Sequence, residues 1–146
     1  MPFISVTRLK LRSWRFLPLF VPHALRTQRQ VEQAPGFRAG SLLPGRGWTF
    51  WTLTSWDDAE AMRAYMLNGA HRTAMPKLSA WCDEASVVHW ETDEAGLPDW
   101  HQAEARMRSD GRPSKVRHPS PDHQAMTFAP PRGFTGTLLR ARRRDR

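Results

Sequence analysis

The residue with the clearest chemical potential in this sequence is His71. It follows Asn68-Gly69, a pair typical of a helix end, so its side chain should reach the mouth of a pocket beside that helix. A neutral imidazole near pH 7 can accept a proton or bind haem iron. The alternative is a structural role, in which the ring caps helix carbonyls or bonds to neighbouring backbone. Both interpretations stay open from the sequence.

Aromatic side chains are unusually frequent around this histidine. Seven of the 146 residues are tryptophan, and such large amphipathic side chains favour interfaces and apolar pockets. We expect an apolar pocket whose lining residues include Trp51, Trp56, Tyr65 and Met75. Taken singly, each of these residues is explained equally well by a core or a dimer contact.

Metal and nucleotide chemistry have little support in the sequence. His101, His118 and His123 are scattered without the spacing of metal ligands, so we expect no metal site. Neither a phosphate-binding glycine loop nor a Gly-x-Ser-x-Gly motif occurs. The single cysteine, Cys82, excludes an intramolecular disulfide, and its place on an apolar stripe indicates an inert buried thiol.

The formal charge of +8 is unevenly distributed along the chain. Residues 1–46 hold eight Lys/Arg and one acidic residue. Residues 47–92 hold three Lys/Arg and six acidic residues, and residues 93–146 hold eleven Lys/Arg and seven acidic residues. The arginine-rich end, residues 140–146, could contact phosphates, but it lacks interleaved aromatic residues. We therefore expect a solvated charge run there, and nucleic acid is not an expected partner.

The elements that must position these residues follow the order β-α-β-β-α-β. Period-two patterns and β-branched or aromatic residues predict strands at 3–11, 37–43, 48–55 and 85–91. This order is that of the ferredoxin-like split βαβ fold. We therefore expect an α+β domain over residues 1–92.

Helices should fill the two long connections between these strands. An apolar stripe at helical spacing predicts the first helix, and it consists of Trp14, Leu17, Val21, Ala24, Leu25, Gln28 and Val31. Pro22 marks either a kink or the start of its regular part. The Ser-x-x-Asp pattern of residues 55–58 predicts the start of the next helix, and a short helix should follow His71.

The third predicted strand carries large apolar residues on both faces. Trp48 and Phe50 alternate with Trp51 and Leu53, whereas a strand with one solvated face would be polar on that side. One face should meet the helices. In so short a chain the other face needs a partner or a ligand, and we expect a second copy of the protein, in a homodimer.

The composition changes after Thr92. Residues 93–109 should form a helical extension, and the Pro/Arg-rich residues 110–146 should form an extended arm or a disordered tail. No apolar run is long enough to span a membrane. The apolar run at 16–21 follows basic residues but lacks the cleavage site of a signal peptide, so we expect a cytoplasmic protein.

One stretch of the chain resembles a known superfamily. The residues that carry the resemblance are Phe50 to Asp57, Ala61, Met62, Tyr65, Gly69, His71, Met75 and Trp81. Over about residues 1–92 they resemble the dimeric α/β-barrel superfamily, in particular the branch of spheroidene monooxygenase and its uncharacterised relatives. The antibiotic biosynthesis monooxygenases are more distantly similar. The resemblance implies two ferredoxin-like sheets packed face to face, with a pocket between the sheet and the helices of each subunit.

The resemblance also implies a range of functions. Members of the superfamily include cofactor-free oxygenases, haem-binding proteins and proteins without known activity, so the fold alone assigns no chemistry. By resemblance we expect an oxygenase-like enzyme that acts on a hydrophobic or polycyclic small molecule, with haem on His71 as the first cofactor to suspect. Cofactor-free relatives hold a polycyclic phenol with Asn, Trp and Tyr, which implies Asn68 and Trp81 as further catalytic candidates. The alternative is a non-catalytic dimeric module that binds a small molecule in the same pocket.

Overall fold

The fold is built on one antiparallel sheet. The computed structural model describes residues 1–142, and residues 143–146 of the basic C-terminal run lie outside the described residues. The strands are β1 (Phe3–Leu11), β2 (Phe37–Pro44), β3 (Thr49–Trp56), β4 (Cys82–Glu91), β5 (Arg112–Pro113) and β6 (Thr137–Arg140). Their order is β5-β4-β1-β3-β2-β6, so the central four strands have the expected ferredoxin-like arrangement.

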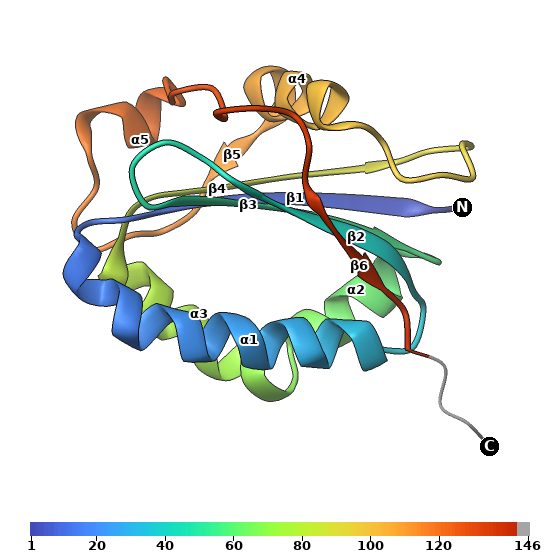
Figure 1. The fold of residues 1–146 in the computed structure, drawn as a ribbon. Helices are drawn as coiled ribbons and strands as arrows, with labels where there is room; N and C mark the ends of the chain where they lie inside the picture. Colours follow the sequence, from blue (N-terminus) through green and yellow to red (C-terminus); the bar gives the residue numbers. More distant parts are fainter. Residues whose placement is uncertain (143–146) are drawn as a thin grey trace.

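Helices cover one face of this sheet (Figure 1). They are η1 (Trp14–Phe16), α1 (Leu17–Gln33), α2 (Ala59–Met66) and α3 (Gly69–Trp81). Pro18 lies in the first turn of α1, where its missing N–H costs no hydrogen bond, and Pro22 lies inside the helix. The expected start of α2 at Ser55 is wrong, because Ser55 and Trp56 still belong to β3. The cap is Asp58, whose carboxylate accepts a hydrogen bond from the Ala61 N–H at 2.8 Å.

The other face of the sheet is covered by the chain itself (Figure 1). Helices α4 (Trp100–Asp110) and α5 (Pro121–Ala125), with the segments around them, form a C-terminal cover, which we define as residues 93–136. Trp51 is almost fully buried against it, with ring centroids 6.3 Å from Trp100 and 5.5 Å from Phe128. We expected a second subunit on this face, but the C-terminal cover occupies it. Beyond the cover, β6 pairs with β2 at the sheet edge.

Within residues 1–142, no helix combines the length and the apolar character that crossing a bilayer requires.

Candidate functional site

A cavity of about 450 Å³ lies between the sheet and the helix layer. This volume is in the range of small-molecule sites. Much of the stripe predicted for the first helix lines it, namely Val21, Ala24, Leu25, Gln28 and Val31. From the other helices come Met62, Tyr65, His71, Ala74 and Leu78. The cavity is therefore a real counterpart of the pocket expected from the aromatic residues.

Hydroxyl groups form part of the cavity floor. Ser5 and Thr7 of β1 lie opposite Thr54 and Thr52 of β3, and all four residues line the cavity. The Thr54 hydroxyl donates to the Ser5 carbonyl at 3.4 Å and accepts from the Trp56 indole N–H at 2.9 Å, which fixes that buried ring. Within residues 1–142, the side chains of Thr7 and Thr52 form no hydrogen bond, so both hydroxyls are free to bind a ligand.

His71 has one ring nitrogen, Nε2, that is unprotonated and can accept a proton. Its Nδ1 lies 3.1 Å from the Met66 carbonyl oxygen, which can only accept, so Nδ1 carries the proton and Nε2 does not. The ring packs on Tyr65 with centroids 4.9 Å apart. Burial lowers the pKa of His71, although the Met66 carbonyl opposes this shift. His71 is therefore neutral at pH 7. Its ring bonds to a helix carbonyl, as the capping interpretation expects, and it also lines the cavity, where its functional role stays a prediction.

Gln30 of α1 holds the segment that presents His71. Its side-chain amide donates to the carbonyl oxygens of Tyr65 at 3.0 Å and Asn68 at 2.7 Å. Its Oε1 accepts the backbone N–H of His71 at 2.8 Å. Three hydrogen bonds from one side chain thus fix the α2–α3 junction to α1, and the sequence pattern did not single out Gln30.

Tyr65 is buried beside His71 and stays protonated. Its hydroxyl donates to the Thr27 carbonyl at 3.3 Å, and its ring lies 5.2 Å from that of Trp56. Burial raises the pKa of the phenol well above its ordinary value. Tyr65 therefore shapes the cavity wall and cannot act as a base near neutral pH.

The structure brings only some of the predicted site residues to the cavity. Trp56, Tyr65 and His71 line it, and Trp51 borders it while packing mainly on the other face. Three predicted residues do not line it: Asn68, Met75 and Trp81. The amide of Asn68 donates to the Ala64 carbonyl at 2.6 Å, as a helix-ending residue would.

Two further histidines line the cavity without having been singled out. His89 lies opposite Ser5 in the β1–β4 register, and His23 lies on α1 with its Nε2 3.4 Å from Lys77 Nζ. The signal was present for His89, because alternation in the predicted strand places it on the same face as Val87. The position of His23 could have been inferred from its neighbour Ala24, which belongs to the predicted apolar stripe and also lines the cavity.

Acidification should destabilise the folded protein through these histidines. Burial is the main cause that lowers the pKa of His71 and of His89 below the ordinary 6.5. Between 6.5 and those lower values the unfolded chain binds more protons than the folded one, so stability falls as pH drops through this window. Thermal unfolding followed between pH 7.5 and about 5 would show this decline. His71→Phe should flatten it and His118→Ala should not; equal slopes in all three proteins would contradict the assignment.

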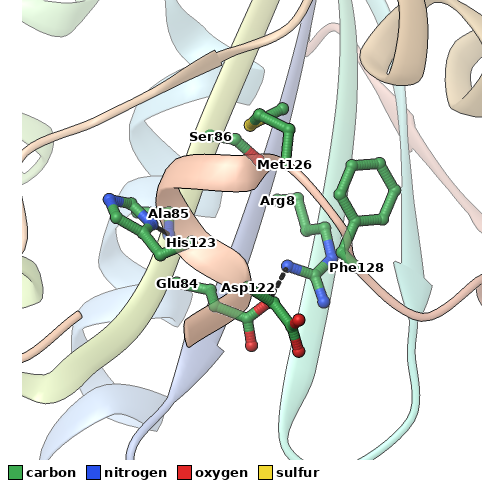
Figure 2. Close-up of a pocket in the computed structure, with 8 residues that line it drawn as sticks. All are labelled: Arg8, Glu84, Ala85, Ser86, Asp122, His123, Met126 and Phe128. Carbon is green, nitrogen blue, oxygen red and sulfur yellow. Dashed lines mark hydrogen bonds and ion pairs between the residues drawn. The ribbon is translucent and has the colours of Figure 1, made fainter. Parts of the chain in front are cut away.

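A second cluster of charged groups lies on the opposite face of the sheet (Figure 2). Arg8 and Glu84 meet there beneath α5 and Phe128, and their packing leaves no free volume for a ligand. His123 accepts the Ala85 N–H at 3.3 Å through Nδ1, and its Nε2 lies 2.8 Å from the Ser114 carbonyl oxygen. Its role is to hold α5 on β4. Within residues 1–142, no three His, Cys, Asp or Glu side chains gather as a metal site would require.

The antiparallel sheet with its helix layer on one face is the antibiotic biosynthesis monooxygenase-like fold. The chain is similar to a variant of SnoaB, a cofactor-independent oxygenase from Streptomyces nogalater, with a TM-score of 0.53 and 18% identity over 64% of this chain and 95% of that one. It is also similar to an antibiotic biosynthesis monooxygenase, with a TM-score of 0.57 and 14% identity over 63% of this chain and 99% of that one. For Rv0793 from Mycobacterium tuberculosis the TM-score is 0.58 and the identity is 13%, over 66% of this chain and 100% of that one. At these identities the likeness shows the fold.

The chain belongs to the family described as Domain of unknown function (DUF3291), whose model matches residues 20–131. None of the curated proteins matches it. The family match extends over α4 and α5, whereas the solved structures are almost fully matched by about two thirds of this chain. The C-terminal cover up to residue 131, which includes α4 and α5, therefore lies within the part of the chain that the family model matches.

Proposed function

We propose that this protein is an oxygenase-like enzyme that acts on a flat, largely apolar small molecule bound in the cavity. The observation that carries the proposal is a neutral histidine with a free Nε2 in an otherwise uncharged cavity. Apolar walls favour a hydrophobic or polycyclic substrate, and the Thr7 and Thr52 hydroxyls suit its polar substituents. The fold likeness to a cofactor-independent oxygenase supports the same class of reaction.

In this reaction His71 is the base. Its Nε2 accepts a proton from an acidic C–H or O–H of the substrate, and the electron-rich anion then reacts with O₂. For an activated methylene the balance is CH₂ + O₂ → C=O + H₂O, in which the substrate supplies all the electrons and the proton on His71 returns to the water. A general base of this kind contributes about 10²–10⁴-fold to the rate.

The alternative is a haem-dependent reaction, in which His71 would be the residue that binds the haem iron. The Nδ1–H of His71 donates to a backbone carbonyl, the arrangement that orients a ligating imidazole through Nε2. No Lys or Arg is among the described residues that line the cavity, so the haem carboxylates would have to extend to solvent. When bound, haem would supply the iron that binds oxygen, and His71 would hold it.

Oxygen consumption with a panel of tricyclic phenols and their methylene ketones tests the proposal. The wild type should consume O₂ and form the ketone, and His71→Phe should reduce kcat by at least about 10²-fold while keeping a ring on Tyr65. His101→Ala is the matched control and should retain activity, because His101 is an exposed residue of α4, on the face of the sheet opposite the cavity. Haem added to the purified protein should give a Soret shift that His71→Phe abolishes, if haem is the cofactor.

The other outcomes decide against the proposal. Ligand-dependent thermal stabilisation without oxygen consumption, with and without haem, would show a non-catalytic binding module. Full activity in His71→Phe would remove the histidine from the mechanism. Absence of any Soret shift would remove the haem version alone.

A further inference from the structure

An uncharged apolar segment on the outside of α1 has no explanation in the packing of the chain. Residues 17–25 carry no charged side chain apart from the titratable His23. Phe20 turns into the core, but Leu19, Val21 and Leu25 are 52%, 45% and 53% exposed. Single exposed apolar residues are ordinary, whereas a cluster of this kind on one segment indicates an interaction surface.

Two exposed tryptophans lie near the segment that leads into α1. Trp14 in η1 is 61% exposed, and Trp48 in the β2–β3 turn is 48% exposed. The Leu11 N–H donates to the Trp48 carbonyl at 3.1 Å, so the turn lies beside the chain that enters η1. We call Trp14, Leu19, Val21, Leu25 and Trp48 the docking surface. Tryptophan is a common residue where a protein meets an interface that is apolar on one side and wet on the other.

The charges around the docking surface are positive. The exposed arginines are Arg12 and Arg15 before the apolar segment, Arg26 and Arg29 after it, and Arg46 in the β2–β3 turn. Residues 1–56 contain one acid, Glu32, and its carboxylate is paired with Arg142 at 2.9 Å. An apolar surface bordered by arginines has the composition of a segment that binds an anionic membrane.

The docking surface also borders the cavity. Val21 and Leu25 are exposed to solvent and at the same time line the cavity. Figure 1 shows that α1 lies beside α3 in the layer that covers one face of the sheet. A molecule that left a bilayer beneath α1 would therefore meet the cavity wall without crossing a large distance in water.

We propose that the docking surface binds an anionic membrane surface and that the cavity receives its apolar ligand from there. The apolar side chains enter the headgroup region and the arginines contact lipid phosphates. A second copy of the chain fits less well, because it would bring two positive surfaces together. Nucleic acid fits less well too, because the aliphatic side chains offer nothing to phosphates. The delivery of ligand rests on the proposed function, whereas the docking does not.

Vesicle binding by the full chain tests this. The protein should co-sediment with vesicles of phosphatidylcholine and phosphatidylglycerol, weakly or not at all with phosphatidylcholine alone, and less as salt is raised. Arg15→Glu/Arg26→Glu should weaken binding by at least about tenfold, and Leu19→Ser/Leu25→Ser should do so in vesicles of the same composition. Leu67→Ser and Arg63→Glu are the matched controls, because both residues are exposed outside the docking surface, and they should bind as the wild type does.

The remaining outcomes would overturn the proposal. No binding to anionic vesicles, or equal binding to both compositions, would exclude the docking. Concentration-dependent dimers in the absence of lipid that Leu19→Ser/Leu25→Ser abolishes would assign the surface to a second copy. Binding of a nucleic acid duplex that needs the arginines and not the leucines would assign it to phosphates. Arg15 and Arg26 do not line the cavity, so turnover of a soluble substrate that Arg15→Glu/Arg26→Glu retains while it loses vesicle binding would exclude a need for membrane delivery and leave the proposed function standing by itself.

Discussion

A chain that ends at residue 92 should self-associate at concentrations where the full chain does not. The deletion removes the C-terminal cover and β6, and it uncovers Ile4, Val6, Trp51, Leu53 and Trp90, which the full chain buries on one face of its sheet. An exposed face of this size, with two tryptophans, is a strong driving force for association or aggregation. Residues 1–92 therefore lack a cover for one face of their sheet. The superfamily resemblance implies a second subunit as that cover, whereas this chain supplies it with its own residues 93–136.

Sedimentation velocity over a range of concentrations measures the difference. The full chain should show no association through this face, and a chain that ends at residue 140 should behave as the full chain does, because it keeps the cover and β6. If the 92-residue chain stayed folded and monomeric at the highest concentration, burial by the cover would be unimportant. If the full chain and the 92-residue chain formed the same dimer, the cover would have to move aside in solution.

The central sheet was predictable because its signals are local. The first predicted strand, 3–11, coincides with β1. The predicted strands 37–43 and 85–91 differ from β2 and β4 at one end only, and 48–55 is shifted by one residue relative to β3. Each strand is defined by alternation over eight to ten residues. The apolar stripe of α1 is equally local, and most of it proved to be the cavity wall.

Local sequence patterns could not predict that residues 93–136 of the same chain form the C-terminal cover. The two apolar faces of β3 showed that both must be buried, but such a pattern does not say which chain buries them. Trp100 and Phe128 come from a region where prolines interrupt every period, so no spacing indicated that they pack together. These side chains are far apart in the sequence, and their contact is visible only in the three-dimensional structure.

The candidate site was predicted in part for a related reason. His71, Ala74 and Leu78 share the inner face of α3 and line the cavity, whereas Met75 lies beside that stripe and is exposed. Trp81 is ten residues after His71, which on a helix is about 15 Å along the axis. It packs instead near His23, with ring centroids 5.5 Å apart. A motif identifies residues that are frequent near a site, but helix geometry decides which of them reach it.

Breaking the buried ion pair on the covered face should cost more stability than any surface charge change. Arg8 Nη1 lies 3.2 Å from Glu84 Oε1, with side chains only 3% and 7% exposed (Figure 2). Burial lowers the pKa of Arg8, while the charge of Glu84 opposes that shift. The guanidinium also packs 4.7 Å from the centre of the Phe128 ring. Each charge is therefore tolerated because the other one is present.

Glu84→Gln should destabilise the protein by about 3–5 kcal/mol, because Arg8 then stays buried without a carboxylate. Arg8→Met should cost somewhat less, since Lys10 Nζ lies 3.4 Å from Glu84 Oε2 and partly compensates. The double variant Arg8→Met/Glu84→Leu should recover most of the loss and unfold within about 1–2 kcal/mol of the wild type, because two apolar side chains replace the pair. Denaturant unfolding of these proteins together with the single variant Glu84→Leu closes the cycle of Arg8→Met and Glu84→Leu and gives the coupling energy.

The exposed pair Arg38–Asp57 supplies the matched control. Its atoms are closer, at 2.7 Å, but the side chains are 42% and 57% exposed. Arg38→Met should therefore change the unfolding free energy by less than about 1 kcal/mol, because water solvates the remaining carboxylate. A cost for Glu84→Gln as small as that for Arg38→Met would mean that water reaches Arg8 and that the C-terminal cover is open in solution. The same cycle thus measures, by a route independent of sedimentation, whether the chain keeps this face of its sheet closed.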